Sequence, residues 1–484
     1  MPSTSCSGAP GLSVTEDEAV RASLLTAQML RDRNRLAAAQ ADMAALRARI
    51  LELEGMPAQR AYETVRRFYR GLPPGLRGVV ARMRDRARAP SAPVPLPPAP
   101  RPAPRPEASG PAASPPPRGR AIVIDDHWPR PDRDAGSVEI VNLVQALGEL
   151  GFEVVLAAAR EHEGPSEARD ALLRAGLPCL LPSQAVSVEE YLSREGMALD
   201  LCVLCRVYCG GRFLETALQH ALRARIVFNS IDLGFLRVER QARLTGDPAA
   251  LAIARQVRER EEAVIRASDA TIVVSRAELD LLRAEMPGAY AVELPLARPV
   301  SPPATPFAGR AGIGFIGGFA HAPNQDAVHH FLTEIWPLVL RDMPEVEMTI
   351  VGPDFPDGLL DGVPGRVRAL GHLPDVGPWF EGLRLTVAPL RFGAGAKGKV
   401  ASSLAAGVPC IASPVAAEGM SLSEESGVLV AADPPAFAAR LREAYGDEAL
   451  WNRLSAGGLA YAADTLSLSG WRNRLDAMLR RIGL

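Results

Sequence analysis

From residue 120 onward, short apolar runs alternate with helical stretches, and this alternation is the strongest constraint on what the chain can fold into. The run RAIVID at 120–125 is followed by a polar loop, by VEIVNLVQALGELG with helical apolar spacing, and by the strand pattern GFEVVLAAA. A helix between two such runs returns the chain to the same end of a sheet, so that the strands run parallel. We therefore expect an α/β fold.

The alternation continues and then restarts after a proline-rich passage at 295–306. Before this passage, the pattern predicts strands at LDLCVLCRV, RIVFNSID and ATIVVS and a helix at 247–267. After it, the pattern predicts helices at 324–342 and directly after residue 399, and strands at GIGFIGGF, VEMTIVG, VRALGHL, LRLTVAPL, PCIASP and GVLVAA. Two Rossmann-like halves joined by a hinge place a cleft between them, and such clefts bind ligands.

The composition is that of an ordinary soluble protein and argues against several classes. The chain has 484 residues, 47% of them hydrophobic, and a formal net charge of -2. Because the charge balance is not basic, we do not expect a nucleic-acid-binding protein. No apolar run of about 18 residues predicts a membrane span, and residues 1–19 lack the basic and then apolar order of a secretion signal. We expect a cytoplasmic protein.

Three of the six cysteines, Cys202, Cys205 and Cys209, lie close enough in the sequence to suggest a metal site. A structural zinc ion needs a fourth ligand, however, and no Cys or His follows at the spacing of a zinc finger. Two of the three also fall in LDLCVLCRV, which has the pattern of a buried strand. We interpret them as small buried thiols and predict no metal site.

Before the α/β region, composition divides the chain into a disordered N-terminus at 1–13, a helix at 14–56, a basic helical segment at 57–89 and a Pro/Ala-rich linker at 90–118. In the first helix, two offset heptad series predict a coiled coil and self-association through 14–53. Asp32 interrupts the second series, and the alternative interpretation is that the helix packs on the protein's own surface. The series consist of Met29, Leu36, Met43 and Ile50, and of Leu25, Ala39, Leu46 and Leu53.

The basic segment has eight arginines between residues 66 and 88, interleaved with aromatic and leucine residues and opposed by few acids. Such a segment either contacts anionic lipid headgroups or forms a solvated basic arm. Peripheral membrane contact through 60–88 is therefore one expectation. The tract that follows, including PVPLPPAPRPAPRPE, predicts an extended linker without a core.

The only two lysines of the chain, Lys397 and Lys399, stand two residues apart in RFGAGAKGKV, while all other basic residues are arginines or histidines. Lysine acts as a compact point charge beside phosphate oxygens, and the preceding glycines let backbone N–H groups approach an anion closely. This favours a phosphate site at 393–399. The alternative is a solvated helix start whose two lysines have no ligand.

Several motifs of the second half occur together in order, namely GFIGGFAHAPNQDAV, TIVGPDFP, ALGHLPDV, VAPLRFGAGAKGKV and LAAGVPCIASPVAAEGM. With IDDHWPRPDRDAGS and FNSIDLGFLRVERQA in the first half, they resemble the glycosyltransferase family 4 group of nucleotide-sugar-dependent enzymes. The resemblance implies the GT-B fold, two Rossmann-like domains facing a central cleft. It places an acceptor-side domain at 119–305, a donor-side domain at 306–466, and a helix at 467–484 that crosses back to the first domain.

The resemblance also implies donor contacts. Gly317 and Gly318 would admit the donor diphosphate, while Gly371 and Leu373 would hold the nucleotide base. The residues meeting the pyrophosphate would be Arg391, Gly393, Gly395, Lys397 and Lys399, aided by the positive end of the following helix. The chain departs from the family pattern in two places. Ala394 and Ser402 stand where many members have a Glu pair, and Ser402 would still bind a ribose hydroxyl of the donor. The Lys common near 323–325 is absent, so that the two lysines would compensate.

In the first half, Asp134 is the best candidate for a carboxylate that touches a sugar hydroxyl, with Asp232 second. Gly136 and Ser137 lie on the same loop as Asp134, next to Asp132, and are expected to face the acceptor or donor sugar. Arg206 either orients acceptor or phosphate or forms a surface ion pair. His127 is an acid or base candidate, although a lone loop histidine more often makes a structural hydrogen bond.

Together these observations predict a hexosyltransferase-type enzyme that moves a sugar from a nucleotide donor to a glycan or lipid-linked acceptor in bacterial surface polysaccharide assembly. The resemblance implies retention of anomeric configuration, with Lys397, Arg391 and Asp134 in catalytic positions and no protein nucleophile. No cofactor or metal is expected, because the lysines and the helix dipole neutralise the leaving diphosphate. The alternatives are a nucleotide-sugar epimerase of the same fold and a non-catalytic binding or scaffold protein.

Overall fold

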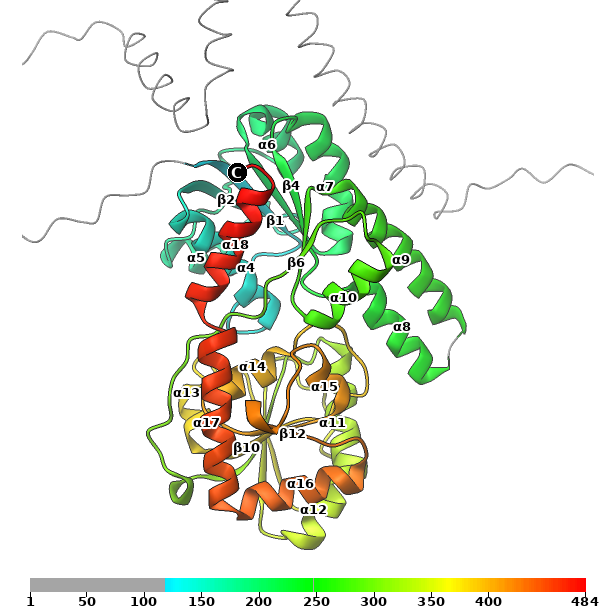
Figure 1. The fold of residues 1–484 in the computed structure, drawn as a ribbon, viewed down its shortest axis with the longest axis vertical. Coiled ribbons are helices and arrows are strands. Elements are labelled where there is room, and N and C mark those ends of the chain that lie inside the picture. Colours follow the sequence, from blue (N-terminus) through cyan, green and yellow to red (C-terminus); the bar gives the residue numbers. More distant parts are fainter. Residues whose placement is uncertain (1–117, 247) are drawn as a thin grey trace, which may run out of the picture. The chain divides into compact units, whose positions relative to one another are not determined.

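The computed structural model describes residues 118–246 and 248–484, and within them two separate sheets of six parallel strands each (Figure 1). The first sheet has the order β2-β1-β3-β4-β5-β6 and the second β12-β11-β10-β7-β8-β9. The strands are β1 (Gly119–Asp125), β2 (Phe152–Ala158), β3 (Leu201–Cys205), β4 (Arg225–Asn229), β5 (Ala270–Val273), β6 (Ala291–Glu293), β7 (Ala311–Ile316), β8 (Glu347–Val351), β9 (Arg366–Gly371), β10 (Leu383–Ala388), β11 (Cys410–Ala412) and β12 (Val428–Val430). The expected α/β class with two Rossmann-like halves is confirmed.

Helices connect the strands, and several begin at Ser or Asp residues whose side chains accept a hydrogen bond from the first turn, as a helix N-cap does. The helices of the first half are α4 (Ala135–Glu149), α5 (Glu167–Arg174), α6 (Val188–Glu195), α7 (Val207–His220), α8 (Gly234–Thr245), α9 (Pro248–Ala267) and α10 (Arg276–Glu285). Those of the second half are α11 (Ala322–His330), α12 (Trp336–Asp342), α13 (Gly377–Gly382), α14 (Gly398–Ala405), α15 (Pro414–Glu418), α16 (Pro434–Gly446), α17 (Glu448–Thr465) and α18 (Leu468–Arg481). Short 3-10 turns lie at Gly196–Ala198, Phe307–Gly309 and Glu424–Ser426.

The single helix predicted at 324–342 is instead two helices joined by a wider π-helical turn at Phe331–Ile335. Pro337 lies in the first turn of α12 and has no N–H to donate to a carbonyl of the preceding turn. The local widening accommodates the missing hydrogen bond. The sequence pattern showed the apolar face of this helix but not the change of pitch.

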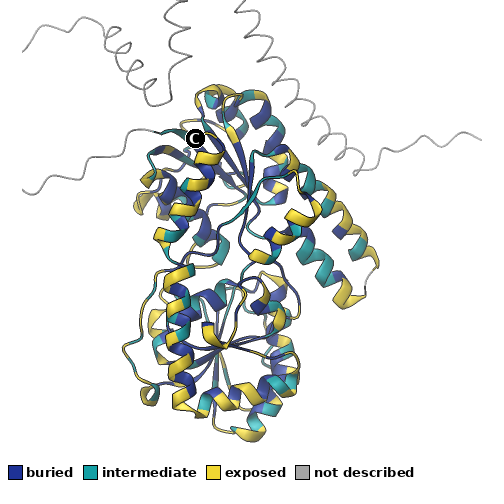
Figure 2. Ribbon diagram, viewed as in Figure 1, coloured by how far each residue is buried: buried dark blue, intermediate teal, exposed yellow. Residues whose placement is uncertain are grey.

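Each sheet has its own apolar core, and Figure 2 shows the strands as buried and the outer faces of the helices as exposed. The last helix, α18, belongs to the core of the first sheet, because Trp471, Leu475 and Leu479 pack there with strand residues. The preceding helix, α17, contributes Trp451 and Leu454 to the core of the second sheet. The chain therefore returns to the first sheet between α17 and α18.

The cysteines of β3 and α7 are buried, free thiols. Burial raises the pKa of Cys202 to about 12, so this thiol stays protonated at neutral pH. Among the described residues, no helix combines the length and the apolarity that crossing a bilayer requires. The predictions for 1–13, 14–56 and 57–89, and for all but the end of 90–118, lie outside the described residues, and the domain boundaries remain predictions.

Candidate active site

A cavity of about 870 Å³ lies between the carboxyl ends of the two sets of strands. Asp125 ends β1, Arg206 follows β3, Gly317 follows β7 and His372 follows β9, and all of them line it. Ligands of parallel α/β sheets bind beyond the carboxyl ends of the strands, where loops rather than ladder pairs supply the polar groups. This cavity is the candidate active site.

Most of the residues proposed from the sequence line this cavity, whereas Arg391, Gly371 and Gly395 do not. Those in the lining are Gly317, Gly318, Leu373, Gly393, Lys397, Lys399 and Ser402 from the second half, and His127, Asp132, Asp134, Gly136, Ser137, Arg206 and Asp232 from the first. Arg391 is exposed and pairs with Asp326 through Nε, at 3.0 Å from Oδ2, and through Nη2. Its guanidinium is therefore engaged outside the cavity.

Lys397 is buried and holds the glycine-rich loop that precedes it. Its Nζ donates to the carbonyl oxygens of Ala394 at 2.8 Å and Gly395 at 2.6 Å. Gly393 and Gly395 have positive φ angles of 151° and 65°, which turn the loop tightly around the ammonium group. An ammonium has three N–H donors, so one remains for a ligand.

Lys399 extends from the first turn of α14 toward the loop after β7. Its Nζ donates to Asn324 Oδ1 at 2.8 Å and lies 5.4 Å from the centre of the Phe315 ring. Asn324 in turn donates through Nδ2 to Gly318 O at 2.7 Å. A Cβ on Gly317 would lie 2.7 Å from Asn324 Nδ2, so only glycine leaves room for this arrangement.

The ammonium groups of Lys397 and Lys399 are positively charged, and the surrounding protein supplies too little negative charge to balance them. Burial lowers the pKa of Lys397 to about 8, against the opposing influence of Glu278 and Asp232. Burial, together with the Lys397 charge, lowers the pKa of Lys399 to about 8. Two desolvated cations beside a helix N-terminus favour an anionic ligand, because an anion restores the charge balance lost on leaving water.

Asp134 is the N-cap of α4, which fixes its carboxylate at the cavity wall. Its Oδ1 accepts from Ser137 N at 2.8 Å, and its Oδ2 accepts from Ser137 Oγ at 2.6 Å. Gly136 lies in the same first turn of α4, where a Cβ would come 3.2 Å from Arg206 Nη2. The carboxylate therefore caps a helix, and Asp134 also lines the cavity.

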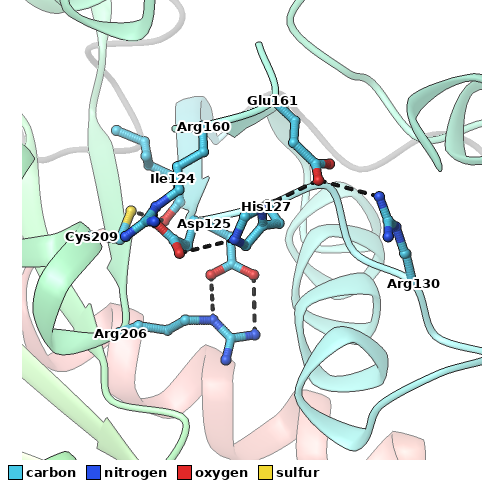
Figure 3. A network of polar contacts seen from close by, with 9 residues as sticks. Ile124, Asp125, His127, Arg130, Arg160, Glu161, Arg206 and Cys209 are labelled. Carbon is cyan, nitrogen blue, oxygen red and sulfur yellow. Dashed lines mark hydrogen bonds and ion pairs between the residues drawn. The ribbon is translucent and has the colours of Figure 1, made fainter. Parts of the chain in front are cut away.

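Arg206 belongs to a polar network on the first-sheet side of the cavity, in which it pairs with Asp125 (Figure 3). Its Nε and Nη2 donate to the two oxygens of the buried Asp125 carboxylate, at 2.7 and 3.3 Å. Although burial opposes it, the paired carboxylate raises the pKa of Arg206. Nearby, the exposed His127 ring bonds Asp126 and Glu161, at 3.2 and 3.3 Å. Arg206 thus makes an ion pair inside the cavity wall.

Asp232 is linked across the cavity to the second half of the chain. Arg237 Nη1 donates to Asp232 Oδ2 at 2.7 Å and lies 3.5 Å from Nε2 of His321, which belongs to the loop after β7. A second link joins Asp132 Oδ2 to His372 Nε2 at 3.1 Å. These contacts hold loops of the two halves next to each other around the cavity.

Sequence reasoning missed Arg298, Arg237, His321 and His372, which also line the cavity. Arg298 lies in the proline-rich passage, where no motif marks it, and donates through Nε to Ser402 Oγ at 3.3 Å. His321 and His372 stand inside the two loops that the strand pattern predicted to face the cleft. Their position directly after a strand was the available signal.

Residues 310–447 match the family model described as "Glycosyl transferases group 1". This segment, less than half of the chain, is similar to group 1 glycosyltransferases. It contains the loop after β7, the glycine-rich loop and both lysines. The search of curated proteins found no significant match to the chain.

Solved structures with the same fold cover three quarters of the chain. Sucrose-phosphate synthase from Thermosynechococcus elongatus matches with 15% identity and a TM-score of 0.59 over 75% of this chain and 99% of its own. Anabaena Alr3699/HepE in complex with UDP-glucose matches with 11% identity and a TM-score of 0.58 over 75% of this chain and 100% of its own. A mutant of S. aureus TarM in complex with fondaparinux, alpha-GlcNAc-glycerol and UDP matches with 8% identity and a TM-score of 0.59 over 74% of this chain and 99% of its own. The fold is GT-B, as expected.

Proposed function

We propose that this protein is a hexosyltransferase-type enzyme that transfers a sugar from a nucleoside-diphosphate donor in the cavity to a glycan or lipid-linked acceptor. The observation that carries the proposal is the position of the chain's only two lysines. Both line the cavity at the start of α14, inside the segment that is similar to group 1 glycosyltransferases. Structural neighbours that hold UDP-glucose, or UDP together with fondaparinux and alpha-GlcNAc-glycerol, support a nucleotide sugar as the donor.

In this proposal the positive charges of the second half stabilise the departing diphosphate. The bond between the anomeric carbon and the diphosphate oxygen breaks, and the acceptor hydroxyl oxygen forms the new bond to that carbon on the same face. The hydroxyl proton passes to the leaving phosphate oxygen, so no protein nucleophile is required. Negative charge grows on the diphosphate as this happens, and the Lys397 and Lys399 ammonium groups and the N-terminus of α14 are placed to balance it.

The acceptor is proposed to approach from the first-sheet side, past Asp134, Gly136, Ser137, Arg206 and Asp232. Asp134 and Asp232 offer carboxylate oxygens that accept hydrogen bonds from sugar hydroxyls. The resemblance to family 4 supports retention and a role in bacterial surface polysaccharide assembly. We also propose a cytoplasmic location, and a reaction without a metal ion because the two lysines and the helix dipole balance the charge of the leaving diphosphate. Turnover that is unchanged in excess EDTA is the outcome expected for the last of these.

The first experiment is a screen for the donor nucleotide. UDP, GDP, ADP, CDP, dTDP and inorganic pyrophosphate are each added to the full chain, and the shift in melting temperature is measured, because a ligand of the native state raises it. The compound with the largest shift is called the probe diphosphate below. The absence of a shift with every compound would contradict a donor site in this cavity.

The second experiment tests transfer itself. Release of free nucleotide from sugar donors that carry the chosen base is followed over time with and without glycan and lipid-linked acceptors. Acceptor-dependent release that disappears in the Lys397→Met, Lys399→Met double variant is expected. Binding of the probe diphosphate without release from any donor and acceptor pair would instead indicate a sugar-nucleotide-binding protein, and would overturn the transferase proposal.

A further inference from the structure

Arg298 lies where the chain passes from the first sheet to the second, and its side chain is only 8% exposed. Its backbone N–H donates to Leu466 O at 2.8 Å, directly after α17, where the chain returns to the first sheet. The two connections between the halves are therefore hydrogen-bonded to each other at this residue. Arg298 also lines the cavity, so it joins the hinge to the candidate active site.

The guanidinium of Arg298 is held from three sides. Nη1 donates to Glu139 Oε1 of α4 at 2.5 Å and to Ala297 O at 2.6 Å, and Nε donates to Ser402 Oγ of α14 at 3.3 Å. Glu139 is also buried and accepts from Ala297 N at 3.2 Å. The pair is thus fixed in orientation by contacts to both halves of the chain.

Nη2 is the one nitrogen of the Arg298 guanidinium that takes no part in these contacts. A guanidinium has five N–H donors, and in the described part of the chain Nη2 makes no hydrogen bond to the protein. Arg298 lines the cavity, so a ligand in the cavity can reach these N–H groups. Because Nε and Nη1 are engaged by the protein, Nη2 is the part of the guanidinium that is available to an acceptor in the cavity.

The position of Nη2 identifies the kind of acceptor. A Cβ built on Gly398, the first residue of α14, would lie 3.3 Å from Nη2. The nitrogen is thus next to the helix end that carries Lys397 and Lys399, and the electrostatic potential there favours an anion. Planar N–H groups of arginine suit phosphate oxygens particularly well.

We propose that Arg298 is a third cation of the donor site, and that its Nη2 binds a phosphate of the nucleoside diphosphate at the start of α14. This rests on the proposed function, since it assumes that the donor diphosphate occupies this helix end. Glu139 then acts as the counterion of Arg298 when the site is empty, and limits how strongly Arg298 attracts the phosphate. Because Arg298 stands on the connection between the halves, donor binding adds a contact to a residue of the hinge.

Two substitutions with opposite expected effects test the proposal by calorimetry with the probe diphosphate. Arg298→Gln removes the cation and should weaken binding at least tenfold. Glu139→Gln keeps the side-chain size and the acceptor for Ala297 N but removes the counterion, and should tighten binding at least threefold. If Arg298 has only a structural role, Glu139→Gln should leave the affinity for the probe diphosphate unchanged or weaken it, because the variant disturbs the partner of Arg298.

Arg310→Gln is the matched control, since Arg310 is a buried arginine of the second half that bonds the backbone carbonyls of Thr305, Phe380 and Leu383 and lies outside the cavity lining. Arg310→Gln should lower the melting temperature and leave the dissociation constant of the folded protein within twofold of wild type.

If Arg298→Gln also leaves the dissociation constant within twofold while Lys399→Met weakens binding, the inference is wrong and the proposed function stands. If Arg298→Gln does not fold, Glu139→Gln decides alone, and affinity that is unchanged or weaker overturns the inference. Failure of the wild-type protein to bind any compound of the panel overturns both.

Discussion

Lys399 Nζ donates a 2.8 Å hydrogen bond to Asn324 Oδ1 and so connects the first turn of α14 to the first turn of α11. The resemblance to family 4 leads one to expect a lysine near 323–325, and this chain has none there. The ammonium group of Lys399 contacts the start of that helix instead. We therefore expect Lys399 to compensate for the missing lysine.

Lys399→Met should weaken binding of the probe diphosphate by about 1.5–3 kcal/mol, the usual range for losing a hydrogen bond to a charged group. Asn324→Ala is the control, because it removes the partner in the empty site and leaves the ammonium group in place. We expect a smaller loss for Asn324→Ala than for Lys399→Met by calorimetry. Equal losses of affinity in the two variants would mean that the hydrogen bond between Lys399 and Asn324 only positions this part of the chain, and that the Lys399 ammonium group does not bind the ligand.

Lys397→Met should weaken binding and also lower the stability of the protein. From the sequence alone, removing this lysine would affect affinity with little effect on stability. In the structure its Nζ holds two carbonyl oxygens of the glycine-rich loop, which lose their donor in the variant. A loss of about 1–3 kcal/mol in unfolding free energy is expected for buried acceptors left without a donor. Denaturant unfolding of the two lysine variants side by side checks this, and equal unfolding free energies would contradict it.

Affinity for the probe diphosphate should fall as the pH rises above about 8. The pKa values of Lys397 and Lys399 are both lowered from 10.5 to about 8, so the empty folded protein loses these protons between pH 8 and 10.5 while the unfolded chain keeps them. The unfolded state then binds more protons, so the free energy of unfolding rises with pH across that range, because the cost of burying the two charged ammonium groups is relieved. Calorimetry from pH 7 to 9.5 should show a decline in wild type that is smaller in Lys399→Met. A flat profile in wild type would contradict charged lysines as the ligand contacts.

Asp134 has two separable tasks, capping α4 and offering an oxygen to a sugar hydroxyl. Asp134→Asn keeps the Oδ1 acceptor for Ser137 N, whereas Asp134→Ala removes the cap at a cost of about 1 kcal/mol. If the carboxylate contacts a substrate, both variants should lose turnover although only the Ala variant loses stability. Normal turnover in Asp134→Asn would leave this residue with a capping role alone.

The sequence was sufficient for the parts of the site that follow directly from strand ends. Gly317 was located because the apolar run before it ends where a parallel sheet presents its loops, and Leu373 was located through the resemblance to family 4. Lys397 and Lys399 stood out because lysine is absent elsewhere. Local patterns of this kind are enough to predict where such residues lie in the fold.

Contacts between residues far apart in the chain could not be predicted in this way. Arg391 stands close to the lysines in the sequence, yet it pairs with Asp326, 65 residues earlier, and does not line the cavity. Arg298 became visible only when the folded chain placed it against Glu139 and Ser402, 159 and 104 residues away. A single sequence does not encode which of its many arginines meets which carboxylate, because tertiary packing selects the pairs.

Gly398→Ala tests whether close contact between α4 and α14 shapes the cavity. A Cβ on Gly398 would lie 2.4 Å from the Cβ of Ala135, so the two helix starts must move apart. Overpacking of this kind typically destabilises by about 1–3 kcal/mol, and the shift should also weaken binding of the probe diphosphate. Gly446→Ala is the control, because a Cβ there has nothing within 4 Å. The double variant Ala135→Gly, Gly398→Ala removes the clashing methyl group and should recover most of the affinity in calorimetry. If the double variant binds as weakly as Gly398→Ala alone, the defect does not come from this contact.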